Sequence, residues 1–312
     1  MPQSSKNAQE RLTRAIHSLH GLSCGDAFGE RFFVHPELAR SLIAQRAVPS
    51  RPWRYTDDTA MAIAITEILE EHGEIRQESL AESFGRNFLA DPQRGYGPAM
   101  HTLLPELASA PSAWKKMAPA LFKGGGSFGN GAAMRVAPLG AYFADDLTQL
   151  TEQAELSAVI THSHPEGAAG AIAVALAAAL AWRHKGSPMT PCDFLQEVCE
   201  RTPESEVRRG LIKALALPSN STVEPAVAAL GNGSKVSAQD TVPFALWAAA
   251  HHLDDYPDAL WTTVSGLGDR DTTCAIVGGI VAMSAGVETI PVSWIQSCEP
   301  LPAWFLYPKP QN

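Results

Sequence analysis

Two short acidic motifs, far apart in the sequence, most constrain how this chain can fold. The first is Thr56-Asp57-Asp58-Thr59 and the second is Gly268-Asp269-Arg270-Asp271-Thr272. Each is followed by an apolar run rich in small residues, 61–69 and 274–283, whose composition indicates a helix. We therefore expect two helices that pack closely with their N-termini together, so that the acidic motifs meet.

The residue types in these motifs indicate a site for two divalent metal ions. Adjacent aspartates repel each other, and bound cations would keep both ionised. Carboxylate and hydroxyl oxygens suit hard ions such as Mg²⁺ or Mn²⁺, whereas zinc prefers histidine and cysteine at short spacing. A structural interpretation competes, because a threonine or aspartate before an apolar run is also an ordinary helix N-cap. The occurrence of two such motifs favours the metal site.

The rest of the chain predicts a nearly all-α fold. Apolar residues at helical spacing indicate a first helix over 6–22, which we expect to run into the glycines at 21–25. Further helices are expected over 57–72, 77–90, 99–108, 146–160, 165–184, 192–200, 204–216, 224–230, 240–252, 255–264 and 272–285. No run of alternating strands and no internal repeat is visible. The 312 residues are 45% hydrophobic, so we expect one compact domain over 11–312 after a flexible polar arm over 1–10.

Charge and cysteine content narrow the classes of function. The formal net charge is −9 and no basic cluster is present, so we expect no nucleic acid bound through its phosphates. The five cysteines are odd in number and widely spaced, which predicts neither disulfides nor a zinc knuckle and is typical of a reducing compartment such as the cytoplasm. The N-terminus lacks an apolar signal-peptide core. The one membrane-like stretch, 167–182, is short and half alanine, so we expect a buried helix and no membrane partner.

A glycine-rich segment, 123–131, is the other informative stretch. Five glycines in nine residues leave backbone N–H groups accessible, an arrangement that cradles a phosphate at a helix start. A flexible linker explains the composition equally well. The segment matches neither the Walker pattern nor the dinucleotide fingerprint.

Taken together, the motifs resemble those of the ADP-ribosylglycohydrolase family, metal-dependent enzymes related to dinitrogenase reductase-activating glycohydrolase. The resemblance covers about residues 15–286 and rests on six motifs in order: Gly25-Asp26-x-x-Gly29, the first acidic motif, Gly129-Asn130-Gly131 with Met134-Arg135, Thr161-His162, Val242-Pro243-Phe244-Ala245-Leu246-Trp247, and the second acidic motif. It implies a compact all-α domain with two Mg²⁺ or Mn²⁺ ions in a cleft, acting on an ADP-ribosylated protein.

The resemblance also assigns roles to individual residues. The metal ligands would be Thr56, Asp57, Asp58, Asp269, Asp271 and Thr272. The glycine-rich loop would hold the diphosphate and distal ribose of the substrate through Gly129, Asn130, Gly131 and Met134. His162 would contact the same ribose, although by itself a structural histidine is an equally good interpretation of His162.

Two positions depart from the family pattern. Phe33 stands where members often carry a glutamate, so we expect the nearby Glu30 to be the catalytic carboxylate that orients or deprotonates the attacking water. The structural alternative for Glu30 is a surface acid. Arg270 stands between two of the metal ligands, and we expect its cation to meet substrate.

The expected reaction is metal-dependent hydrolysis of an N-glycosidic bond, with ADP-ribosyl-arginine as the first candidate. The segment 25–33 resembles a bacterial arginine-directed branch in which some members protect cells from ADP-ribosylating toxins, so such a toxin is a further expected partner. The alternatives are a hydrolase of serine-linked ADP-ribose and a non-catalytic protein that binds ADP-ribose or a toxin. Prenyl-diphosphate chemistry needs Asp-Asp-x-x-Asp spacing, and Met61 stands where the third acid would be.

Overall fold

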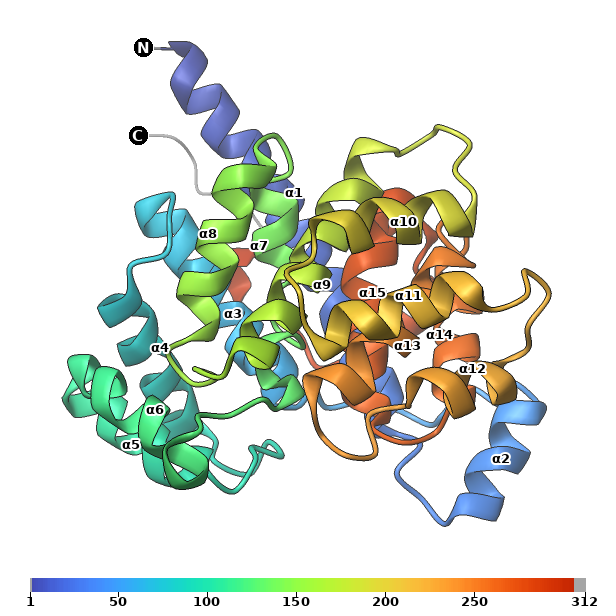
Figure 1. Ribbon diagram of the computed structural model, residues 1–312, viewed down its shortest axis with the longest axis horizontal. Coiled ribbons are helices and arrows are strands. Elements are labelled where there is room, and N and C mark those ends of the chain that lie inside the picture. The colour runs from blue at the N-terminus through green and yellow to red at the C-terminus, as the bar shows by residue number, and fades with distance from the viewer. Residues whose placement is uncertain (1, 306–312) are drawn as a thin grey trace.

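The computed structural model describes the backbone of residues 2–305, and Figure 1 shows that this backbone is built from helices. In chain order they are α1 (Pro2–Glu30), α2 (Pro36–Ala44), α3 (Asp57–His72), α4 (Gln77–Ala90), α5 (Met100–Ser109), η1 (Pro111–Ala113), α6 (Trp114–Gly124), η2 (Asn130–Ala132), α7 (Ala137–Tyr142), α8 (Leu147–Ala158), α9 (Pro165–Arg183), α10 (Pro191–Arg201), α11 (Glu206–Ala216), α12 (Val223–Leu230), α13 (Ala238–Ala250), α14 (Tyr256–Ser265), α15 (Arg270–Ser284), η3 (Val287–Thr289), α16 (Val292–Ile295) and η4 (Ala303–Phe305). Within this range β-pairing is limited to two isolated bridges. The expected all-α class is confirmed.

Most helices lie where the sequence predicts them. Helices α3 and α4 have the predicted bounds, and α8 to α15 differ from prediction by a few residues at most. The sequence analysis missed α2, α6, α7 and the short α16. Helix α2 buries a single residue, Ala39, so its apolar stripe is too short to be recognised by periodicity. Helix α6 contains a proline, and its last residues leave helical geometry.

The sequence predicts that the first helix ends among the glycines at 21–25, but α1 continues to Glu30. Gly21, Gly25 and Gly29 are four residues apart, so they lie on one face of α1, which we call the glycine seam. A methyl group on these glycines would lie 2.1–2.3 Å from a backbone carbonyl oxygen of α15, that of Gly278 for Gly21, Cys274 for Gly25 and Arg270 for Gly29. The two helices are therefore antiparallel and in backbone contact, and the end of α1 lies beside the start of α15.

We expect Gly25→Ala to destabilise the protein by roughly 2–3 kcal/mol, because its methyl group would push two packed backbones apart. This cost exceeds the roughly 1 kcal/mol by which alanine is the better helix former. The measurement is the urea midpoint of unfolding followed by circular dichroism. Gly97→Ala is the matched control, because a methyl group there meets no atom within 4 Å. If Gly25→Ala is as stable as the wild type, the close backbone contact between α1 and α15 at the glycine seam is contradicted.

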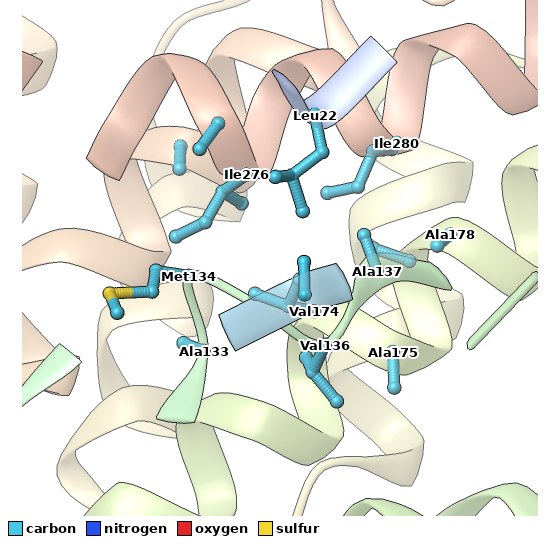
Figure 2. Close-up of a cluster of buried hydrophobic side chains, with 14 of the residues drawn as sticks. Leu22, Ala133, Met134, Val136, Ala137, Val174, Ala175, Ala178, Ile276 and Ile280 are labelled. Carbon is cyan, nitrogen blue, oxygen red and sulfur yellow. The ribbon is translucent and has the colours of Figure 1, made fainter. Parts of the chain in front are cut away.

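Helix α9 lies in the middle of the core. By length and composition it could span a membrane, but 83% of its apolar stretch is buried inside the structure, as expected for a core helix. In Figure 1, α1, α9 and α15 lie centrally, with α3 to α8 on one side and α10 to α14 on the other. Figure 2 shows Leu22 of α1 and Ile276 of α15 pointing toward Val174 of α9. The small side chains of α9 let neighbouring helices come close.

The expected N-terminal arm is helical from Pro2 onward. Residues 2–10 form the first part of α1, which projects from the body of the molecule in Figure 1. The flexibility of this arm and the single domain over 11–312 stay predictions. Met1 and residues 306–312 lie outside the described range.

Candidate metal and ligand site

Three helices place carboxylates at one end of the core. Asp26 lies near the end of α1, Asp57 and Asp58 lie in the first turn of α3, Asp269 is the N-cap of α15, and Asp271 lies in its first turn. These groups influence one another, since the negative charge of Asp26 raises the pKa of the others in α3 and the charge of Asp271 raises that of Asp58. The fold thus brings the two acidic motifs together.

Asp26 fixes the start of α3, a role that the sequence analysis did not assign. Its buried carboxylate accepts hydrogen bonds from the backbone nitrogen and the hydroxyl of Thr56, at 2.9 and 2.8 Å. It also accepts from the nitrogen and the hydroxyl of Thr59, at 3.1 and 2.5 Å. The first N–H groups of a helix have no partner within the helix. Asp26 therefore caps α3 from α1, and its place in the Gly25-Asp26-x-x-Gly29 motif was the available sequence signal.

Two details of the cluster call for positive charge. The hydroxyl oxygen of Thr56 lies 2.8 Å from Asp26 Oδ1 and 2.7 Å from Asp58 Oδ2, yet a hydroxyl has one proton to donate. The other oxygen of Asp58, Oδ1, is buried and has no hydrogen-bond partner in the described part of the chain. A buried carboxylate oxygen without a partner is costly. Either protons or cations must neutralise these groups.

Burial is the main reason that the carboxyls of the cluster hold protons tightly. It raises the pKa of Asp26 to about 6 and that of Asp57 to about 8. The pKa values of Asp58, Asp269 and Asp271 are raised as well, again mainly by burial. Among residues 2–305, none of the five forms an ion pair with lysine or arginine. A cluster of this kind binds cations if they are offered.

The donor set fits a hard divalent ion. The oxygens of the two motifs suit Mg²⁺ or Mn²⁺, and the unpaired Oδ1 of Asp58 is a ready ligand atom. No group of three or more His, Cys, Asp or Glu side chains in residues 2–305 is already gathered as a metal shell. The donors therefore need side-chain adjustment to enclose a metal, and the ligand roles of Thr56, Asp57, Asp58, Asp269, Asp271 and Thr272 stay predictions.

A cavity of about 480 Å³ adjoins the acidic cluster. One wall includes Asp57, and the lining includes every residue predicted to hold the ligand: Gly129, Asn130, Gly131, Met134 and His162. The remaining lining residues are Met61, Gly95, Gly97, Pro98, Ala99, Met100, Phe122, Ser127, Phe128, Lys235 and Val236. Asn130 Nδ2 donates to Asp269 Oδ2 at 2.6 Å, so the cavity wall is tied to the second acidic motif.

The glycine-rich segment is anchored at several points and does not resemble a flexible linker. The carbonyl oxygen of Phe128 accepts a hydrogen bond from Ala238 N at 3.0 Å, and that of Ser127 accepts from His164 N at 3.3 Å. Gly126 has a φ of 70°, and a methyl group there would lie 2.4 Å from Ser163 Oγ. The segment is thus held against the chain before α9 and the start of α13, and its role as a phosphate cradle stays a prediction.

Exposed apolar residues at the rim of the cavity were missed from the sequence. Phe122 and Phe128 are 63% and 43% exposed, and their ring centres are 6.4 Å apart. Phe122 and Lys123 have φ values of 51° and 63°, and Val236 across the rim has 52°. Side chains other than glycine rarely adopt this left-handed region, and strained backbone concentrates at functional sites. Phenylalanines flanking a glycine-rich segment were the available sequence signal.

Two charged residues with expected roles, Arg270 and Glu30, lie near the end of α1. Arg270 donates from Nη1 to the carbonyl oxygen of Phe32 at 2.7 Å, and its guanidinium lies 5.0 Å from the centre of the Phe33 ring. It ties the start of α15 to the end of α1, and the expectation that it meets substrate stays a prediction. Glu30 is the last residue of α1 and is exposed, and its pKa is raised by partial desolvation and by the charges of Asp26 and Asp269. Its catalytic role stays a prediction.

Comparison with known proteins gives consistent results over nearly the whole chain. A family model described as ADP-ribosylglycohydrolase matches residues 7–306. The protein named ADP-ribosylhydrolase ARH3 of Homo sapiens is 29% identical, over 94% of this chain and 91% of its own length. ADP-ribosyl-[dinitrogen reductase] glycohydrolase of Rhodospirillum rubrum is 25% identical, over 92% and 90%. A solved structure titled ADP-ribosylglycohydrolase-related protein complex is similar in fold, with a TM-score of 0.63, 21% identity, and coverage of 93% and 94%.

Proposed function

Because this chain belongs to the ADP-ribosylglycohydrolase family, we propose that it removes ADP-ribose from a modified protein by metal-dependent hydrolysis of the glycosidic bond. The observation that carries this proposal is the cavity of about 480 Å³, which joins the acidic cluster to all five residues expected to hold the ligand. Two divalent ions would be held by Thr56, Asp57 and Asp58 at the start of α3 and by Asp269, Asp271 and Thr272 at the start of α15. When bound, they would stabilise the charge that develops as the sugar bond breaks.

The residues of the chain supply binding and proton transfer. Asn130 keeps Asp269 in place by its hydrogen bond, and the backbone of the glycine-rich segment lies where it can meet a diphosphate. The exposed rings of Phe122 and Phe128 offer a surface on which a flat aromatic base could stack. Glu30 would take the proton of the attacking water, and its raised pKa makes it a stronger base than an ordinary glutamate.

The linkage and the biological setting are the finer part of the proposal. We place arginine first, from the likeness of the segment 25–33 to the arginine-directed branch, and serine second. The chain is 29% and 31% identical to the ARH3 proteins of Homo sapiens and Bos taurus, and 25% identical to ADP-ribosyl-[dinitrogen reductase] glycohydrolase. The overall sequence likeness therefore does not favour dinitrogen reductase as the substrate of this chain. Protection against an ADP-ribosylating toxin rests on that segment alone. All five cysteines are free, which is consistent with a reducing, cytoplasmic location.

The test is release of ADP-ribose from peptides modified on arginine and, separately, on serine. We expect release with Mg²⁺ or Mn²⁺, none after chelation, and the larger kcat/KM on the physiological linkage. Glu30→Gln should lower kcat by about 10²–10⁴-fold, the usual contribution of a general base. Glu37→Gln, on the exposed surface of α2, is the matched control.

Each outcome separates the alternatives. Binding of ADP-ribose without release from either peptide would show a non-catalytic binder. Full activity of Glu30→Gln alongside an active wild type would assign the base to another carboxylate of the cluster.

A further inference from the structure

The histidine of the cavity is linked to a buried arginine through one hydroxyl group. Arg135 is completely buried, and its guanidinium stacks 4.4 Å from the centre of the Phe84 ring. Its Nη2 donates to the carbonyl oxygen of Ser157 at 3.1 Å and to Thr161 Oγ1 at 2.9 Å. Thr161 Oγ1 in turn lies 2.7 Å from His162 Nδ1. Because a guanidinium can only donate, the direction of the first hydrogen bond is fixed.

That direction determines where the proton of the Thr161 hydroxyl goes. The hydroxyl oxygen already accepts from Arg135, and Thr161 is fully buried. Within residues 2–305, His162 Nδ1 is the one acceptor recorded for its proton. If Nδ1 carried a hydrogen instead, the hydroxyl would be a buried donor without an acceptor, an arrangement that folded proteins avoid. The hydroxyl therefore donates to Nδ1.

The remaining ring nitrogen of His162 then carries the hydrogen. Burial, with a contribution from the Arg135 charge, lowers the pKa of His162 to about 3, so the ring is neutral and has one N–H group. Nε2 lies beside the glycine-rich segment, since methyl groups on Gly129 and Gly131 would come within 3.1 and 3.0 Å of it. No hydrogen bond from Nε2 is recorded within the described part of the chain, and His162 lines the cavity.

We propose that Arg135 and Thr161 are positioning residues that hold His162 as the Nε2–H tautomer, so that the cavity presents a hydrogen-bond donor to an oxygen atom of its ligand. The ligand's identity rests on the proposed function, in which ribose and phosphate oxygens of an ADP-ribosyl group are the acceptors. The arrangement also accounts for the glycines on either side of Asn130, because the imidazole occupies the space that their side chains would need.

The test is the nitrogen-15 NMR spectrum of the His162 ring in the ligand-free protein, assigned by the signals lost in His162→Gln. We expect the wild type to show a hydrogen on Nε2 and none on Nδ1. Thr161→Val keeps the shape of the side chain but removes the hydroxyl, so the Nδ1–H tautomer should become populated and the Kd for ADP-ribose should rise about tenfold. Thr161→Ser, which keeps the hydroxyl, should behave as the wild type in both measurements.

A wild-type ring with its hydrogen on Nδ1 would overturn the proposal, as would an unchanged tautomer in Thr161→Val. If that variant does not fold, the wild-type spectrum decides. The tautomer is measured without substrate or metal, so its outcome is independent of the hydrolysis assay. A protein with the expected tautomer but no ADP-ribose release would refute the proposed function and leave the positioning roles intact.

Discussion

Replacing Asp58 with asparagine should reduce metal-dependent ADP-ribose release by more than about 100-fold, because outer partners of metal ligands alone typically contribute 10–100-fold. The same change should leave the metal-free protein at least as stable as the wild type. Asp58 is buried with one oxygen unpaired, and its pKa is raised by burial and by the charges of Asp26, Asp271 and Asp57. Removing this carboxylate relieves repulsion in the cluster while it removes a predicted metal ligand.

The opposite signs of these two effects make the experiment specific. Release of ADP-ribose and binding of Mn²⁺ should both fall in Asp58→Asn, while the melting temperature without metal is maintained or rises. Asp254→Asn, at an exposed aspartate in the turn after α13, is the matched control and should change neither quantity. A variant that loses stability together with activity would assign Asp58 a structural role at the start of α3.

The second large effect is a loss of stability in the metal-free protein as the pH rises from about 6.5 to about 8. The pKa of Asp57 is about 8 in the folded protein, whereas an unfolded aspartate titrates near 3.9. A raised pKa means that the protonated form stabilises the fold, and this stabilisation is lost as the pH rises through the folded value. The contribution of Asp26, with a pKa of about 6, is largely lost by the start of this window. Histidines with lowered pKa, such as His162, act in the opposite direction but only below about pH 6.5.

Divalent metal should reverse this loss, because a bound cation replaces the protons. At a concentration 100 times its Kd, a ligand adds about 2.7 kcal/mol to the stability of the folded state. For a chain of this size this corresponds to a rise in melting temperature of roughly 4 °C. Differential scanning fluorimetry of metal-free protein, with and without Mg²⁺ or Mn²⁺ across the window, gives the measurement. A stabilisation by metal that shrinks as the pH rises would contradict a site built from these carboxyls.

The sequence predicted the elements of the site better than the contacts between them. Helix α3 is recognisable because its apolar run lies between a threonine cap and Gly73, which are local signals. The five residues predicted to bind the ligand line one cavity, and their motifs follow one another in a recognisable order, although their binding role stays a prediction. By contrast, Gly21 and Gly25 suggest a helix end when only neighbours in sequence are considered. In the structure they lie inside a helix. Their lack of side chains lets α15, some 250 residues away in the chain, pack directly against that helix.

Side-chain direction was the other feature that the sequence did not determine. Arg270 lies between two predicted ligands, but its buried side chain donates to the carbonyl oxygen of Phe32, beyond the end of α1. Asp26 belongs to a recognisable motif, yet its function as a cap depends on where α1 crosses the start of α3. Such roles depend on the relative placement of helices, which local composition does not encode.

The glycine seam allows α1 to pack against α15 only at certain positions along the helix axis. Carbonyl oxygens of α15 face Gly21, Gly25 and Gly29 at intervals of four residues on both helices. A small axial slide of α1 would bring bulkier neighbours against that backbone, so the next compatible register is a full helical turn away, about 5.4 Å. Asp26 of α1 is consequently held at a fixed position relative to the second acidic motif at the start of α15. Adaptation to substrates of different shape is then left to the loops around the cavity mouth, which evolution can vary without altering the spacing of the carboxylates.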